Sequence, residues 1–189
     1  MVGTMIKIVD LFATPVAVFD NLYPDYQTIA AEATKVVDGL TTPPGWNCDI
    51  ASSFKVYDQV IEQLPPDFKQ AILDAANQYS VRYWKQKCKI ANSWVNKASS
   101  KQYQEQHNHI TAIGACQFSG VYYPQIQLDE KLTFHSPYNS IALIDQGMNR
   151  SSIGALLNRL IVFPSYLEHS FKAIERTTDK ISIAINFKI

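Results

Sequence analysis

The last segment of the chain alternates strictly between two kinds of side chain. One set is apolar and the other is small or polar: Ile181, Ile183, Ile185 and Phe187 against Lys180, Ser182, Ala184 and Asn186. Because successive side chains of a strand point to opposite faces, this pattern predicts a strand with two different surroundings. We expect the Ile/Phe face to pack against helices. We expect the other face to line a barrel cavity that holds a polar ligand.

Elsewhere the hydrophobic pattern changes near residue 90. Before this point, an extended stretch is predicted at residues 7–19 and helices at 25–38, 56–64 and 67–86. After it, short strands are predicted at 93–97, 117–123, 131–134 and 159–163. Helices first and strands after predict an α+β fold in which N-terminal helices buttress a β-barrel. We expect one domain over residues 1–189, with the supporting helices in 1–90 and the barrel in 91–189.

Residues 125–157 have the weakest pattern and contain two turn-like stretches, 136–140 and 147–150. We expect much of this segment to form a loop over the mouth of the cavity, where loops often determine substrate choice.

Composition narrows the class of protein. The 189 residues are 47% hydrophobic and 18% charged, with a formal net charge of zero. This suits a globular protein and gives no overall basic surface for nucleic acid. The three cysteines form no C-x-x-C pair, which argues against a disulfide framework or a cysteine zinc site. Without a signal peptide or a run of membrane-spanning length, we expect a cytoplasmic protein with no membrane partner.

Three of the four histidines suggest a metal site. His107 and His109 are two positions apart, so in a strand they point to the same face. His169 on a neighbouring strand would complete a three-ligand site with open positions for substrate or dioxygen. The spacing alone also fits two polar residues on an exposed strand, and it is the third histidine that favours a metal.

Several motifs together resemble one known family. They are Trp94-Val95-Asn96, His107-x-His109, Ser119-Gly120-Val121-Tyr122-Tyr123, Phe163-Pro164-Ser165-x-Leu167-x-His169 and Lys180-Ile181-Ser182. Their order is similar to that in 2-oxoglutarate- and Fe(II)-dependent oxygenases of a subgroup often found in bacteriophage and marine bacterial genomes, and more distantly to prolyl 4-hydroxylases. The resemblance runs from about residue 92 to residue 189.

The resemblance implies a double-stranded β-helix, that is, a jelly-roll or cupin-like barrel. It also implies that His107 and His169 bind Fe(II). His109 occupies the position where the wider superfamily has Asp or Glu, although the subgroup also tends to have His there. A three-histidine site is neutral and leaves the metal its full charge. His109 could instead contact the other ligands or the substrate.

The resemblance further implies that a basic residue after the distal histidine binds the far carboxylate of 2-oxoglutarate. Lys180 stands there, where the subgroup usually has Arg. By itself, Lys180 also fits the solvated start of a strand. A tyrosine hydroxyl, from Tyr122 or Tyr123, and Ser182 would be further partners. Tyr122 is preferred if its face of the strand points inward.

One departure concerns a turn. The family generally has Gly shortly before the strand at 159–163, whereas this chain has Asn158, which tolerates the same left-handed conformation.

The predicted function is a 2-oxoglutarate/Fe(II)-dependent dioxygenase that hydroxylates a protein side chain or small molecule and converts 2-oxoglutarate to succinate. Its partners would be 2-oxoglutarate and dioxygen, in the host cytoplasm if the gene belongs to a phage. Two alternatives remain open. One is a cupin-like three-histidine enzyme that does not use 2-oxoglutarate, and the other is a non-catalytic jelly-roll interaction protein.

Overall fold

The computed structural model describes residues 13–110, 116–138 and 149–189. Its helices are α1 (Tyr26–Val37), α2 (Pro66–Trp84) and a short 3-10 helix at Val60–Gln63. Its strands are β1 (Ala17–Phe19), β2 (Ala51–Ser52), β3 (Lys89–Ala98), β4 (Gln104–His107), β5 (Phe118–Gln125), β6 (Lys131–His135), β7 (Arg150–Gly154), β8 (Arg159–Pro164), β9 (His169–Phe171) and β10 (Lys180–Lys188).

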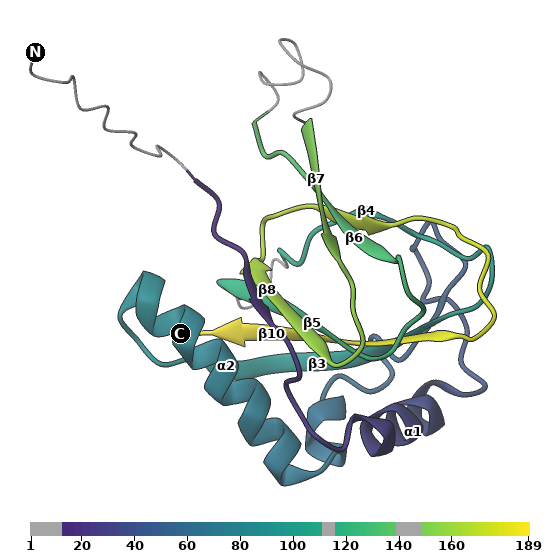
Figure 1. Cartoon of the computed structure of the whole chain (residues 1–189), viewed down its shortest axis with the longest axis horizontal. Coiled ribbons are helices and arrows are strands. Elements are labelled where there is room, and N and C mark those ends of the chain that lie inside the picture. Colours follow the sequence, from purple (N-terminus) through teal and green to yellow (C-terminus); the bar gives the residue numbers. More distant parts are fainter. Residues whose placement is uncertain (1–12, 111–115, 139–148) are drawn as a thin grey trace, which may run out of the picture.

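The strands form two antiparallel sheets. The larger sheet has the order β1-β8-β5-β10-β3-β2, and the smaller one has the order β4-β9-β6-β7. Figure 1 shows α1 and α2 on one side of the larger sheet and the smaller sheet on its other side. This is a double-stranded β-helix supported by helices, and the predicted fold class is confirmed.

The two faces of β10 have the surroundings that its alternation predicts. Ile181, Ile183 and Ile185 are buried in one apolar cluster with residues of both helices. On the opposite face, Lys180 and Asn186 are buried between the two sheets. The apolar face thus fastens the helices to the barrel, and the polar face is left to line its interior.

The observed bounds of the two long helices are close to the predicted ones, and the residues at their ends explain why. The side chain of Asp25 accepts a hydrogen bond from the backbone N–H of Thr28 and so caps the start of α1. Pro66 stands in the first turn of α2, where its missing N–H is not needed. Lys85, with φ of 60°, ends α2 in the left-handed conformation.

Asn158 also has a positive φ, of 57°, as expected for the residue in place of Gly. Its side-chain oxygen accepts hydrogen bonds from the backbone N–H of Tyr23 and the hydroxyl of Tyr122. The turn before β8 therefore also fixes the chain that leads into α1.

Some strands depart from the prediction. Residues 125–157 were expected to be largely loop, yet they include all of β7, which pairs with β6 in the smaller sheet. β7 is an edge strand and mostly polar, so it has no apolar alternation to reveal it. β9 and β2 also lacked a pattern, because they have only three and two residues. Parts of the predicted loop (139–148) and of the opening stretch (7–12) lie outside the described residues.

Within the described ranges, no helix is both long and apolar enough to cross a membrane.

Candidate metal centre

Strand pairing brings the three predicted histidines together. His107 ends β4 and lies directly opposite His169 on β9. His109 follows just after β4, where its backbone N–H donates to the carbonyl of Ser165 at 2.9 Å. One potential ligand nitrogen from each ring lies within 4.8 Å of the other two. A compact three-nitrogen cluster thus lies where β4 and β9 pair.

The orientation of each ring is fixed through its Nδ1 atom. This atom lies 2.8 Å from the carbonyl oxygen of Glu105 in His107, 3.0 Å from that of Leu167 in His169, and 2.9 Å from Oδ1 of Asn186 in His109. Since these oxygens only accept, each Nδ1 carries the proton and each Nε2 keeps a lone pair, which in His107 faces the Gln104 amide nitrogen at 3.5 Å. Metal-binding histidines typically have this second interaction, which sets their tautomer and direction.

The three histidines are held in the neutral form that binds metals. Burial is the main cause of a lowered pKa in all of them, and it takes the pKa of His109 to about 3. The neighbouring rings add to the effect at His109 and His169, because two imidazolium charges repel. Neutral imidazoles with directed Nε2 atoms fit a divalent transition metal such as iron.

Asn186 connects His109 to a chain of buried hydroxyls. Its Oδ1 accepts from His109 Nδ1 and, at 2.7 Å, from Ser119 Oγ. Ser119 Oγ in turn lies 2.8 Å from Ser165 Oγ. A side chain on the polar face of β10 therefore orients His109, whereas backbone carbonyl groups orient His107 and His169.

Lys180 lies deeper in the barrel, on the same face of β10 as Asn186. It is 1% exposed, and its Nζ is 3.3 Å from the centroid of the Phe171 ring. Phe171 follows His169 by two residues on the same face of β9. Burial lowers the pKa of Lys180 to about 7, while Glu130 raises it and Arg176 lowers it further. The solvated strand start that the sequence also allowed is wrong.

The preference for Tyr122 is also wrong. Its ring packs against Phe68 of α2, with centroids 5.0 Å apart, and its hydroxyl donates to Asn158 Oδ1 at 2.8 Å. Tyr123 occupies the inner face and contacts Phe171, with centroids 6.1 Å apart. The condition placed on Tyr122, that its face points inward, does not hold, because the Phe118/Gly120/Tyr122 face of β5 packs on the helices.

Tyr123 is fully buried, and its hydroxyl has no hydrogen-bond partner among the described residues. Burial raises its pKa, and the charge of Glu130 raises it further. The hydroxyl is therefore a protonated donor without an acceptor. Ser182, the other predicted partner of the co-substrate, is also buried and belongs to the polar face of β10.

A buried ion pair beside Lys180 was not predicted. Arg176 Nε and Nη2 donate to the two carboxylate oxygens of Glu130 at 3.0 and 2.9 Å. Arg176 Nη1 also donates to the carbonyls of Ser99 and Gln102. No motif or periodicity marks these residues, because the pair joins two loops far apart in sequence. Their opposite charges also cancel in any count of net charge.

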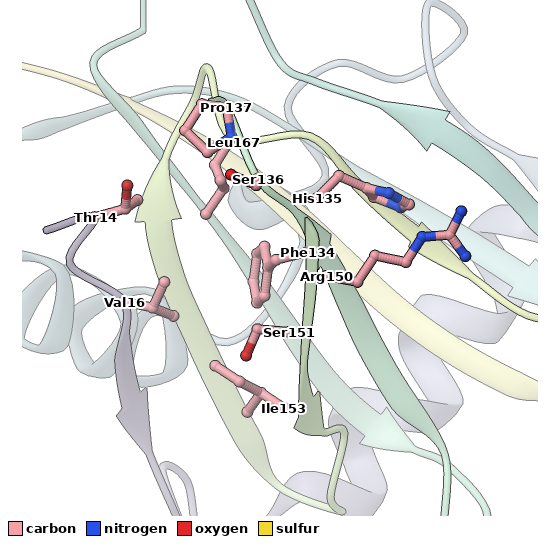
Figure 2. Close-up of a pocket in the computed structure, with 10 residues that line it drawn as sticks. All are labelled: Thr14, Val16, Phe134, His135, Ser136, Pro137, Arg150, Ser151, Ile153 and Leu167. Atoms are coloured by element: carbon pink, nitrogen blue, oxygen red, sulfur yellow. The ribbon is translucent and has the colours of Figure 1, made fainter. Parts of the chain in front are cut away.

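Two hollows lie near this region. The smaller, of about 150 Å³, is lined by His107 and His109 together with aromatic side chains that the sequence did not mark, including Trp46. The larger, of about 380 Å³, lies between Val16, ahead of β1, and inner side chains of β6 and β7. Figure 2 shows Val16, Phe134 and Ile153 around the larger hollow, which none of the three clustered histidines lines.

Comparison with solved structures supports the fold. HygX from Streptomyces hygroscopicus, solved with nickel and 2-oxoglutarate, aligns with a TM-score of 0.65 and 13% identity, covering 92% of this chain and 82% of that one. A prolyl-4-hydroxylase from Pseudomonas putida gives 0.61 and 15%, covering 93% and 92%. SnoN, an α-ketoglutarate-dependent epimerase of nogalamycin biosynthesis, gives 0.68 and 10%, covering 93% and 78%.

The search of curated proteins found no match. The family described as "Putative 2OG-Fe(II) oxygenase" matches residues 92–186, just over half of the chain, and this stretch contains all three clustered histidines and Lys180. The chain therefore belongs to the 2OG-Fe(II) oxygenase family, whose cofactors are Fe(II) and 2-oxoglutarate.

Proposed function

We propose that this oxygenase is a hydroxylase, with Fe(II) held by His107, His109 and His169. The observation that carries the assignment of ligands is the set of three Nδ1 contacts, which leaves three Nε2 lone pairs in one small volume. Three neutral ligands on one side of an ion leave positions for a chelating co-substrate and for dioxygen.

We further propose that Lys180, Tyr123 and Ser182 hold the far carboxylate of 2-oxoglutarate. Lys180 and Tyr123 offer buried donors on the inner face, and the Tyr123 hydroxyl has no acceptor of its own in the described structure. A carboxylate placed there would pair with the ammonium and accept from the hydroxyl, which relieves the cost of burying both.

When bound, iron and 2-oxoglutarate supply the oxidising chemistry: 2-oxoglutarate and dioxygen become succinate and carbon dioxide, and the second oxygen atom enters a C–H bond of the substrate. The protein positions both ends of the co-substrate and excludes water. The walls that exclude water around the inner end are apolar, with Phe163 and Phe171 both buried beside His169.

The test begins with the cofactors. Metal-stripped protein is melted without oxygen, with Fe(II) or Mn(II), and with or without 2-oxoglutarate. A ligand that binds only the folded state raises the melting temperature. We expect a shift with metal and a further shift when 2-oxoglutarate is added. A shift with metal alone would instead support the three-histidine enzyme that does not use 2-oxoglutarate, and no shift would support a non-catalytic jelly roll.

Hydroxylation itself is then tested by turnover in labelled dioxygen, with candidate amines and peptides as substrates. We expect one labelled oxygen atom in succinate and one in the product. A product altered without gaining oxygen would assign the protein to another reaction of the same family.

A further inference from the structure

The 150 Å³ pocket beside the histidines has aromatic walls. The rings of Trp46 and Phe54 are 5.4 Å apart between centroids, and those of Phe54 and Trp94 are 5.0 Å apart. The same walls reach the candidate metal ligands, because Trp46 stacks on His107 at 6.5 Å and Trp94 contacts His109 at 5.2 Å. A group bound between these rings would lie next to the metal.

The charge at this pocket is negative. Glu105 is the lining residue with a formal charge. The nearby Cys48 thiol is neutral: burial chiefly raises its pKa to about 12, a hydrogen bond to the Glu105 side chain and the charges of Glu105 and Asp49 add to this, and the Ile50 backbone opposes it. Lys55 stands over the Phe54 ring at 5.5 Å from its centroid, but it does not line the pocket.

Polar atoms of the lining also lack partners. Among the described residues, four buried side-chain polar atoms have no hydrogen bond of ordinary geometry, and two of them, Glu105 Oε2 and Trp94 Nε1, belong to this pocket. The other carboxylate oxygen of Glu105 accepts from the backbone N–H of Asn47 at 3.0 Å, which holds the side chain in place. Trp94 is 4% exposed, so its Nε1 is buried within the pocket wall. Of the two, Glu105 Oε2 is the acceptor that a ligand with N–H donors can satisfy, since Trp94 Nε1 is itself a donor.

We propose that the primary substrate presents an alkylammonium group to this pocket, between the aromatic rings and the Glu105 carboxylate. This identification of the substrate class rests on the proposed hydroxylase function. Aromatic faces attract cations, and the attraction grows when the site is shielded from water. A carboxylate beside them adds a direct partner and repels anions. The volume is below the range of pockets that enclose drug-sized ligands, so a single side chain or a small amine fits.

The experiment uses protein loaded with zinc and 2-oxoglutarate, which holds the co-substrate but does not turn over. Butylammonium and its neutral counterpart butanol are titrated while the fluorescence of Trp46 and Trp94 is followed. We expect butylammonium to bind about tenfold more tightly than butanol. Glu105→Gln should abolish most of this preference and Phe54→Leu should reduce it. The matched control Glu32→Gln, a partly exposed carboxylate on α1 that pairs with Lys35, should leave it unchanged.

Equal binding of butanol and butylammonium, or a preference that survives Glu105→Gln, would overturn the proposal. The melting shift with 2-oxoglutarate is recorded on the same samples. If that shift is present and the ammonium preference is absent, the cation site fails and the oxygenase cofactor site stands. If the preference is present without the shift, the co-substrate site fails instead.

Discussion

The two ends of the polar face inside the barrel differ in how their polar atoms are satisfied. At the histidine end, every Nδ1 has an oxygen partner at 2.8 to 3.0 Å. At the lysine end, the Tyr123 hydroxyl has no partner among the described residues, and Lys180 rests on an aromatic ring. The three imidazoles at the first end are oriented before any ligand arrives and suit a metal cation, while the unpartnered Trp94 Nε1 and Glu105 Oε2 belong to the pocket beside them. The second is incomplete and suits an anion that brings acceptors with it.

Removing a histidine should have the largest effect. His169→Ala takes away the ligand that lies directly opposite His107, and two remaining imidazoles bind a divalent metal far more weakly. We expect the metal-dependent melting shift to disappear, along with any succinate formation. The control is His135→Ala, because His135 hydrogen-bonds Ser170 and lies outside the three-histidine cluster. If His169→Ala kept the metal shift, the cluster would not be the metal site.

Lys180→Met should impair ligand binding at the lysine end and leave the histidine end intact. We expect 2-oxoglutarate to bind about a hundredfold more weakly, because a buried carboxylate would lose its charged partner. Metal binding should be retained. The apo protein should melt at the same or a higher temperature, since a buried amine is replaced by an apolar chain of similar length. Lys97→Met, a partly exposed lysine on β3 paired with Asp38, is the control. Loss of metal binding in Lys180→Met would show that the ends are not independent.

Changing the pH should alter 2-oxoglutarate binding at the lysine end. Burial lowers the pKa of Lys180 from 10.5 to about 7. The charged form that attracts the carboxylate is therefore lost as the pH rises above about 7. We expect affinity to weaken by up to about tenfold per pH unit beyond that point. Titrations with Mn(II) at several pH values measure it. Lys180→Arg should flatten the dependence, because Arg stays charged. A flat profile in the parent would mean that Lys180 remains protonated.

The lowered pKa of Lys180 also affects the stability of the apo protein, which should rise with pH where the affinity for 2-oxoglutarate falls. Between about pH 7 and 10.5 the unfolded chain binds a proton at Lys180 that the folded chain does not. The contribution of this residue to stability should therefore rise with pH across that window, and the penalty for burying the ammonium should be complete below it.

The smallest effect should distinguish the adjacent tyrosines. Tyr123→Phe removes one hydrogen bond to the co-substrate, so we expect 2-oxoglutarate affinity to fall by about threefold to tenfold. Tyr122→Phe should leave that affinity unchanged but lower the free energy of unfolding by about 1 kcal/mol, since it removes the hydrogen bond to Asn158. Denaturant titration and 2-oxoglutarate titration of both variants provide the comparison. The reverse outcome would restore the original preference for Tyr122.

The sequence predicted what depends on local pattern. The alternation from Lys180 to Phe187 identified both faces of β10, and the two long helices followed from their periodicity. His107, His109 and His169 could be grouped because their motifs resemble a family. Which alternate residues of β5 face the barrel interior could not be derived, because nearly all of its side chains are buried on both faces. Tyr122 and Tyr123 therefore look equivalent until the sheet is placed against the helices.

Other features depend on contacts between distant segments. Trp46 and Phe54 lie outside the matched motifs, and only folding places them beside His107. In the sequence, Glu130 and Arg176 look like ordinary surface charges, since no local pattern indicates that they are buried. These four residues belong to no repeating pattern along the chain, so only the folded structure reveals their roles.

The Glu130–Arg176 pair has a consequence for how this sequence can diverge. Both side chains are essentially inaccessible to solvent, at 1% and 0% exposure. Replacing one of them leaves an unpaired buried charge, which typically costs about 3–5 kcal/mol, whereas replacing both by apolar residues can be neutral. A protein of ordinary stability therefore cannot tolerate the replacement of Glu130 or Arg176 alone. The two positions are expected to change together or to stay fixed, and comparison of diverged sequences would reveal them as a covarying pair.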